Sequence, residues 1–113
     1  MPFINTKTST PVSKEKETAI KEKLGNAISL LGKSENWLMI NFEENCRLWF
    51  KGNNSEPSAM VEIALFGKAT SSQYDKMTES VCEIISSELQ IDPSRIYVKY
   101  EEVEHWGFSG FNF

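Results

Sequence analysis

In an extended conformation, the first segment of the chain, residues 2–8, divides into one face with Pro2, Ile4 and Thr6 and another with Phe3, Asn5 and Lys7. A period of two is typical of a strand with one buried face, so this segment is predicted to be a short β-strand. Apolar residues then recur at helical spacing between Ile20 and Leu31. Ser13 is expected to cap the start of this helix, and Gly32 is expected to end it.

The apolar run Trp37–Phe42 predicts a mostly buried strand. Residues 46–50 are compatible with a short additional strand, and residues 51–57 are expected to form a turn-rich loop. The first half of the chain is therefore predicted to run from strand to helix to strand.

The second half repeats this order. Residues 60–66 predict an apolar strand, and the polar run Thr70–Ser72 lies where a helix cap belongs. Apolar side chains from Tyr74 to Leu89 then follow a helical stripe. Asp92-Pro93 is expected to break that helix before a final strand over residues 95–103.

These elements predict one α+β domain, residues 1–113, made of two β-α-β pseudo-repeats at about residues 2–50 and 57–103 and a C-terminal tail. Helical crossovers favour parallel pairing within each half, giving a four-stranded sheet with both helices on one face. The other face would then need cover. The aromatic residues expected to gain cover through self-association are Phe66, Trp106, Phe108, Phe111 and Phe113.

The composition narrows the class of protein. The chain is 40% hydrophobic and 25% charged, which suits a folded domain, and its net charge of −4 argues against a nucleic-acid partner. Cys46 and Cys82 form no metal-ligand pattern with His105, so we expect no metal and no cofactor. One disulfide between the two cysteines is an open alternative, but we expect reduced thiols in an intracellular protein. No signal peptide or membrane span is recognised, and we expect a cytoplasmic protein with no membrane partner.

Pro2 is the most informative single residue. An initial methionine before a small residue is normally removed, which would leave Pro2 as a free secondary amine. Burial or a nearby cation lowers the pKa of an amine toward neutrality, where it can act as a base beside a carbonyl group. The alternative is structural, because proline is also tolerated as the first residue of a strand.

Several short segments carry a family resemblance over essentially the whole chain: Met1–Ile4, Leu31–Lys33, Ser55–Pro57, Asp92–Val98 and the tail Trp106–Phe113. In their order and spacing they resemble the macrophage migration inhibitory factor family of the tautomerase superfamily. The resemblance implies a homotrimer with active sites between subunits. It also implies keto–enol tautomerase activity on phenylpyruvate-like or dopachrome-like compounds.

The resemblance also assigns roles to residues. Pro2 would be the general base and then the acid, Lys33 would hold a substrate carboxylate, and Tyr97 would come from the neighbouring subunit. The remaining substrate-binding candidates are Phe66, Lys99, Trp106, Phe108 and Phe113. Alternation places Tyr97 and Lys99 on one strand face, so both can point into one site. Structural alternatives stay open: Lys33 as a helix-end charge, Tyr97 as a strand aromatic, and the tail rings as interface filler.

The sequence departs from the family pattern at four places. Residues 58–61 lack the C-x-x-C of some members, so the chain gives no support for thiol–disulfide chemistry. Phe66 stands where a smaller aliphatic residue is usual, Lys99 where asparagine is usual, and Phe108 where tryptophan is frequent. These changes leave the substrate preference open.

Two other functions compete with the tautomerase. The first is a cytokine-like ligand for a receptor protein, exported without a signal peptide. The second is a related hydratase or dehalogenase, which would need additional arginines, whereas this chain has only Arg47 and Arg95.

Overall fold

The computed structural model describes residues 1–113 as two helices on a four-stranded mixed sheet. The sheet has the order β2-β1-β3-β4, with strands β1 Pro2–Thr8, β2 Met39–Glu43, β3 Ala59–Phe66 and β4 Ile96–Val103. β1 is parallel to β2 and β3 is parallel to β4, whereas the central pair β1–β3 is antiparallel. The predicted α+β fold and the parallel pairing within each half are confirmed.

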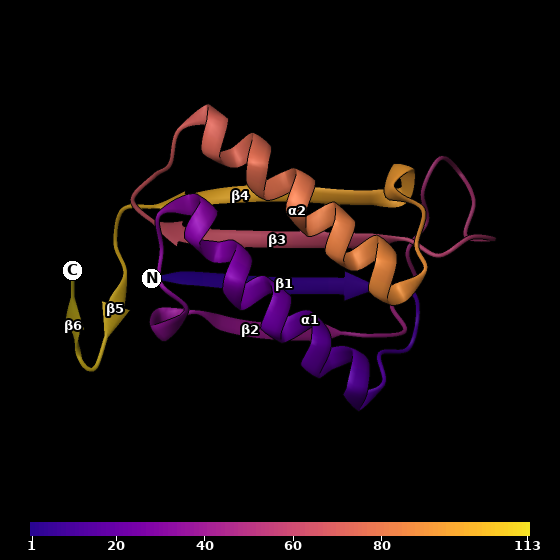
Figure 1. Cartoon of the computed structure of the whole chain (residues 1–113), viewed down its shortest axis with the longest axis horizontal. Helices are drawn as coiled ribbons and strands as arrows, with labels where there is room; N and C mark the ends of the chain where they lie inside the picture. The colour runs from indigo at the N-terminus through magenta and orange to yellow at the C-terminus, as the bar shows by residue number, and fades with distance from the viewer.

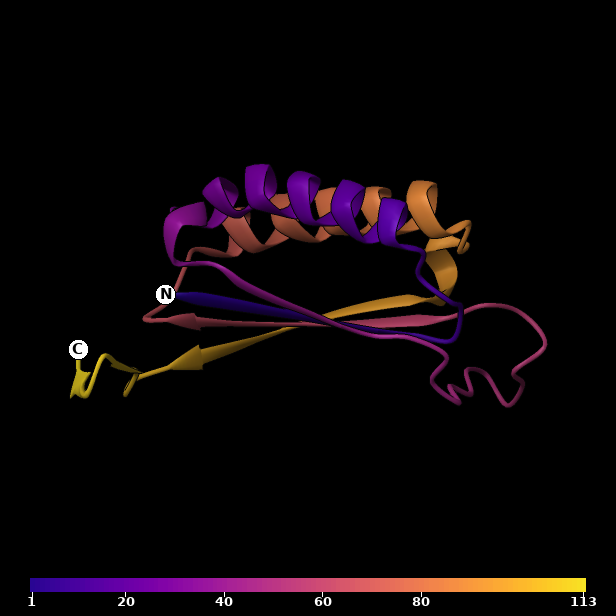
Figure 2. The same cartoon turned by 90° about the horizontal axis from the view of Figure 1, so that it is seen from below.

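Both helices lie on the same face of the sheet, and the chain leaves the opposite face uncovered (Figures 1 and 2). The helices are α1 Lys14–Ala27 and α2 Ser71–Leu89. Their apolar stripes, with Leu24 and Met77 fully buried, pack on helix-facing strand residues such as Ile4 and Ile63. The core therefore lies between the two layers, and we call the uncovered side of the sheet the open face.

The helix boundaries follow the predicted caps. The hydroxyl of Ser13 accepts a hydrogen bond from the Lys16 amide at the start of α1. A short 3₁₀ turn, Ile28–Leu31, continues the helix to Gly32, whose left-handed φ of 72° ends it. Thr70 and Gln73 form a reciprocal capping box at the start of α2.

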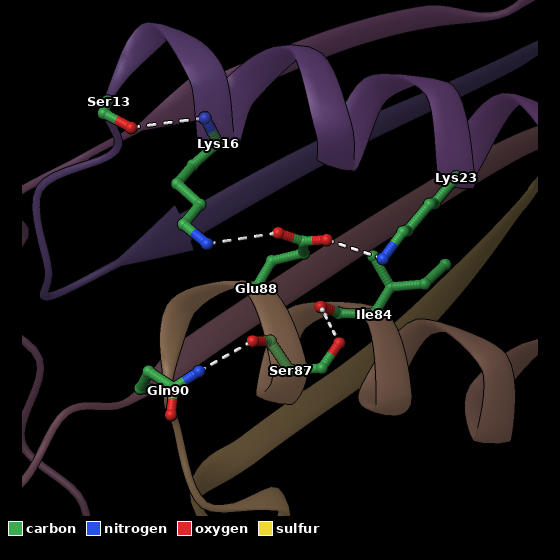
Figure 3. Close-up of polar contacts among 7 residues, drawn as sticks. All are labelled: Ser13, Lys16, Lys23, Ile84, Ser87, Glu88 and Gln90. Carbon is green, nitrogen blue, oxygen red and sulfur yellow. Dashed lines mark hydrogen bonds and ion pairs between the residues drawn. The ribbon is translucent and has the colours of Figure 1, made fainter.

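The two helices are also tied by charge. The Glu88 carboxylate of α2 lies 2.6 Å from the Lys23 ammonium and 3.4 Å from that of Lys16, both on α1 (Figure 3). The hydrogen bond from Lys23 is the main reason that the pKa of Glu88 lies below its ordinary value. These ion pairs link the two helices where they lie side by side on the sheet.

Two predictions for the middle of the chain were wrong. Residues 37–42 are not a mostly buried strand, because β2 is an edge strand with one neighbour and Met39 is 68% exposed. Trp37 precedes it in a 3₁₀ turn, Glu35–Trp37. Residues 46–50 form no strand, since only Phe50 makes an isolated bridge, to Asn53. That segment has no sheet neighbour within the chain.

The open face carries a polar network in its middle. The Glu62 carboxylate of β3 pairs with Lys7 at 3.0 Å and with Lys99 at 3.2 Å. Asn5 is only 8% exposed, and its amide nitrogen donates to Glu43 at 2.7 Å. These contacts satisfy polar groups on a face that no part of the same chain covers.

Two further findings concern the chain as a whole. Cys46 and Cys82 are unpaired. Neither helix has the length and apolar character that crossing a membrane requires.

Candidate active site

The start of the chain lies beside Lys33 at one end of the sheet. Antiparallel pairing of β1 with β3 places Pro2 opposite Leu65, and the Phe66 amide donates to the Met1 carbonyl at 2.9 Å. The carbonyl of Phe66 in turn accepts a hydrogen bond from the Lys33 ammonium at 2.9 Å. Phe66 thus joins the first residue of the chain to Lys33.

Lys33 reaches this position because of the turn before it. Gly32 adopts a left-handed conformation after the 3₁₀ turn, and the chain then returns toward the sheet as the extended residue Ser34. The Lys33 side chain is half-buried, and its ammonium has three donors, of which the Phe66 carbonyl uses one. The remaining donors are available to an anionic ligand.

Burial and charge both act on the terminal amine. The pKa of the Met1 ammonium is lowered from 8.0, first by burial and then by the positive charge of Lys33. Pro2, the next residue, is buried. This end of the sheet therefore favours a neutral amine, which is the form that can accept a proton.

Aromatic rings from distant parts of the chain meet at the same end. The ring of Phe113 lies 5.8 Å from Phe66 and 6.3 Å from Phe108. Phe108 also makes an edge-to-face contact with Trp37 at 5.1 Å between centroids. Phe108 and Phe113 come from the C-terminal hairpin, β5 Gly107–Phe108 and β6 Phe111–Asn112, which lies beyond the end of the sheet near the N-terminus (Figure 1).

A groove of about 730 Å³ runs along these elements. It lies between the start of β1, the turn before β2 and the C-terminal hairpin, and most of its lining is apolar. Of the predicted site residues, Pro2, Trp106 and Phe108 line it, whereas Lys33, Phe66 and Phe113 are not among its lining residues. The lining residues that sequence reasoning did not single out include Met1, Trp37, Leu38, Met39, Ala64 and Glu101.

Trp37 is the most prominent of these additional residues. It is 49% exposed, although it is a large aromatic side chain. Its position only four residues after Lys33 was the one feature of the sequence that could have placed it near the site. The run Trp37–Phe42 was instead predicted to be a strand. Its contact with Phe108 depends on tertiary structure and has no local signature.

The structure does not bring Tyr97 and Lys99 to this groove. Tyr97 is the second residue of β4, at the opposite end of the sheet, pairs with Met60 and is 61% exposed. Lys99 lies in mid-strand and is bound to Glu62 in the open-face network. Both side chains lie on the predicted open face, so within one chain they are separate from Pro2.

Comparison with known proteins places this fold in a family. The model of the macrophage migration inhibitory factor (MIF) family matches residues 1–112. The chain belongs to the MIF family. Among its curated members, the macrophage migration inhibitory factor of Mus musculus is 24% identical over 115 residues, which cover 100% of this chain and 99% of the relative.

Solved structures agree with this assignment. The crystal structure of Leishmania major MIF2 has a TM-score of 0.94 and 31% identity, and the match covers 100% of this chain and 97% of that one. The MIF homologue from Prochlorococcus marinus has a TM-score of 0.88 and 31% identity, covering 98% of both chains. The fold expected from the resemblance is thereby shown.

Proposed function

We propose that this MIF-family protein is a keto–enol tautomerase for aryl 2-oxo acids of the phenylpyruvate type, with Pro2 as the base once Met1 has been removed. The observation that carries the proposal is the position of Lys33. Its ammonium lies beside the start of the chain, where burial already lowers the pKa of the terminal amine. A cation, a neutral amine and an apolar groove are what this reaction needs.

The proposed reaction is a proton transfer within one substrate molecule. The prolyl nitrogen takes a proton from the carbon beside the ketone, and the electron pair of that C–H bond forms the enol double bond. The carbonyl π electrons move to oxygen, which is then protonated by the prolyl ammonium. The reverse sequence returns the proton to carbon, so atoms and charge balance without a cofactor.

Lys33 would hold the substrate carboxylate with the donors that Phe66 leaves free. The aromatic body of the substrate would then lie along Phe108, Trp106 and Phe113, with Trp37 at the far side of Phe108. Apolar walls exclude water and so strengthen the attraction between the ammonium and the carboxylate.

We further propose that the active protein is a homotrimer in which Tyr97 and Lys99 act in the site of a neighbouring subunit. Large exposed apolar side chains gather near the groove, as with Phe111 at 80% and Phe113 at 57% exposed. Others, Trp49 at 66% and Tyr97 at 61%, belong to segments at the opposite end of the sheet. Contact between unlike ends of identical chains generates a closed ring when the rotation closes.

The test is the ketonisation of enol-phenylpyruvate by protein whose intact mass shows that Met1 is absent. Pro2→Gly should lower kcat/KM by about 10²-fold or more, because the secondary amine at the proton-transfer position is lost. Pro11→Gly is the matched control, since Pro11 is an exposed residue in the turn after β1, and it should retain full activity. Activity that survives Pro2→Gly would rule out the mechanism, and inactivity of correctly processed protein would favour the receptor-ligand alternative.

A further inference from the structure

Arg95 organises the loop that lies beside Tyr97. Its side chain is only 6% exposed. Its Nε atom donates to the carbonyl of Pro57 at 3.1 Å and to the hydroxyl of Ser58 at 2.9 Å, and its terminal nitrogens donate to the carbonyls of Phe50 at 3.4 Å and Asn53 at 3.2 Å. One planar guanidinium therefore holds together the middle and the end of the loop between β2 and β3.

The same guanidinium also holds an aromatic ring. The central carbon of the Arg95 guanidinium lies 5.3 Å from the centroid of the Phe50 ring, within the range of a cation–π contact. Phe50 is half-buried, and its ring contacts Tyr97 edge to face at 5.1 Å and 84°. The contacts therefore run from Arg95 through Phe50 to Tyr97.

This contact is unusual because of the exposure of Tyr97. A side chain that is 61% exposed on a strand end would ordinarily move among rotamers. Here one side of the Tyr97 ring packs against Phe50, whose own ring lies against the buried guanidinium of Arg95. Tyr97 does not line the groove of its own chain. Its contact with Phe50 therefore points to a role outside that groove.

We propose that Arg95 and Phe50 are positioning residues that fix the Tyr97 ring for the active site of a neighbouring subunit. The inference rests on the proposed tautomerase and its trimer. A side chain that is immobilised before substrate arrives avoids the entropy loss of ordering it on binding. The expected gain in affinity is about 2- to 12-fold for one side chain.

The kinetic experiment compares Phe50→Leu, Tyr97→Ala and the double variant in the ketonisation assay. Phe50→Leu should raise KM by about 2- to 12-fold while kcat changes less than about two-fold, because orientation and not chemistry is lost. The double variant should match Tyr97→Ala alone, since Phe50 acts only through Tyr97. Phe42→Leu, a half-buried phenylalanine on β2, is the matched control and should leave KM unchanged.

Arg95→Lys tests the other half of the arrangement. Lysine keeps the charge but cannot make the planar fork of hydrogen bonds to the loop, so we expect the same rise in KM as in Phe50→Leu. Light scattering on each variant must show an unchanged oligomer, because a KM change caused by dissociation would be a structural effect. Additive KM effects in the double variant, or full activity of Phe50→Leu in an intact oligomer, would overturn the inference.

A measurement without substrate separates this inference from the proposed function. The ring current of Phe50 should change the NMR chemical shifts of the Tyr97 ring protons. Phe50→Leu and Arg95→Lys should both remove this effect and so move those shifts in the same direction. Unchanged Tyr97 signals in both variants would overturn the positioning role even if the enzyme is active. Wild-type protein without Pro2-dependent activity would contradict the tautomerase, whatever the Tyr97 signals show.

Discussion

The side-chain amide of Asn5 donates to the carboxylate of Glu43 at 2.7 Å, across the parallel pair β1–β2. The same nitrogen lies 3.4 Å from Glu62 on the other side, and the Asn5 oxygen accepts from Asn41 at 2.9 Å. A neutral side chain that is 8% exposed thus separates two carboxylates on the open face. Because the Asn5 side chain is an uncharged donor, it can bind both carboxylates without adding another charge to a buried position.

Asn5→Asp should therefore destabilise the fold at pH 7 by about 1–3 kcal/mol, because a third carboxylate replaces the donor. The new carboxyl group would have a raised pKa in the folded state, so the deficit should shrink as pH falls toward 5. Urea unfolding at both pH values measures this. The same substitution at exposed Asn26 of α1 is the control, and equal losses at the two positions would contradict the prediction.

Lys33→Met should raise KM for phenylpyruvate by about 10-fold or more, the size of one charge-assisted hydrogen bond. It should also change the pH profile. The pKa of the Met1 amine is lowered first by burial and then by the charge of Lys33. We expect both causes to act on the Pro2 amine after Met1 is removed, so Lys33→Met should move the acid limb of kcat/KM against pH to higher pH. Lys33→Arg keeps the charge and should keep the limb in place. If the acid limb of the Lys33→Met profile does not move, Lys33 has no influence on the pKa of the catalytic base.

Glu88→Gln should lower the melting temperature slightly at pH 7, because Lys16 and Lys23 lose their shared partner. The pKa of Glu88 is lowered in the folded state, mainly by the Lys23 hydrogen bond. Its contribution is therefore complete above the ordinary carboxyl pKa of 4.5 and is lost as pH falls through the lower folded value. Differential scanning calorimetry should show a smaller difference at pH 3 than at pH 7. Glu83→Gln, an exposed position on α2, is the control.

Gln90→Gly should stabilise the protein by about 0.5–1 kcal/mol, because Gln90 follows α2 in a left-handed conformation that glycine adopts without strain. Its φ is 57°, and its side chain donates to the Ser87 carbonyl at 2.8 Å. Gln90→Ala removes that hydrogen bond and keeps the strain, so it should be less stable than wild type. Chemical denaturation of the three proteins checks the order, and a stabilised alanine variant would contradict the explanation.

Local pattern was sufficient for much of this fold. Both helices were located from the change in the spacing of apolar residues, from every second residue to helical spacing. Ser13, Gly32 and Thr70 marked the helix ends, because capping depends on residues close in sequence. The burial of β2 could not be predicted in this way. Its apolar residues suit a central strand, but its exposure is set by having only β1 as a neighbour.

The candidate site divides in the same manner. The position of Lys33 after a left-handed glycine is local, and its resemblance to a family motif identified it. The contact of Trp37 with Phe108 joins the turn before β2 to the C-terminal hairpin, and no periodicity encodes such a pair. Residues 46–50 were compatible with a short strand, but the local sequence does not show whether a partner strand exists.

The first residue of the chain lines the groove and the last lies beside it, which limits how the protein can be handled. Met1 lines the groove, and Phe113 packs on Phe66 at its margin. An affinity tag before Pro2 would cover the amine, and one after Phe113 would load the hairpin that forms a wall. A tagged preparation could therefore be folded and still inactive, so reporter groups belong on the outer, solvent-facing side of α1 and α2 (Figure 2).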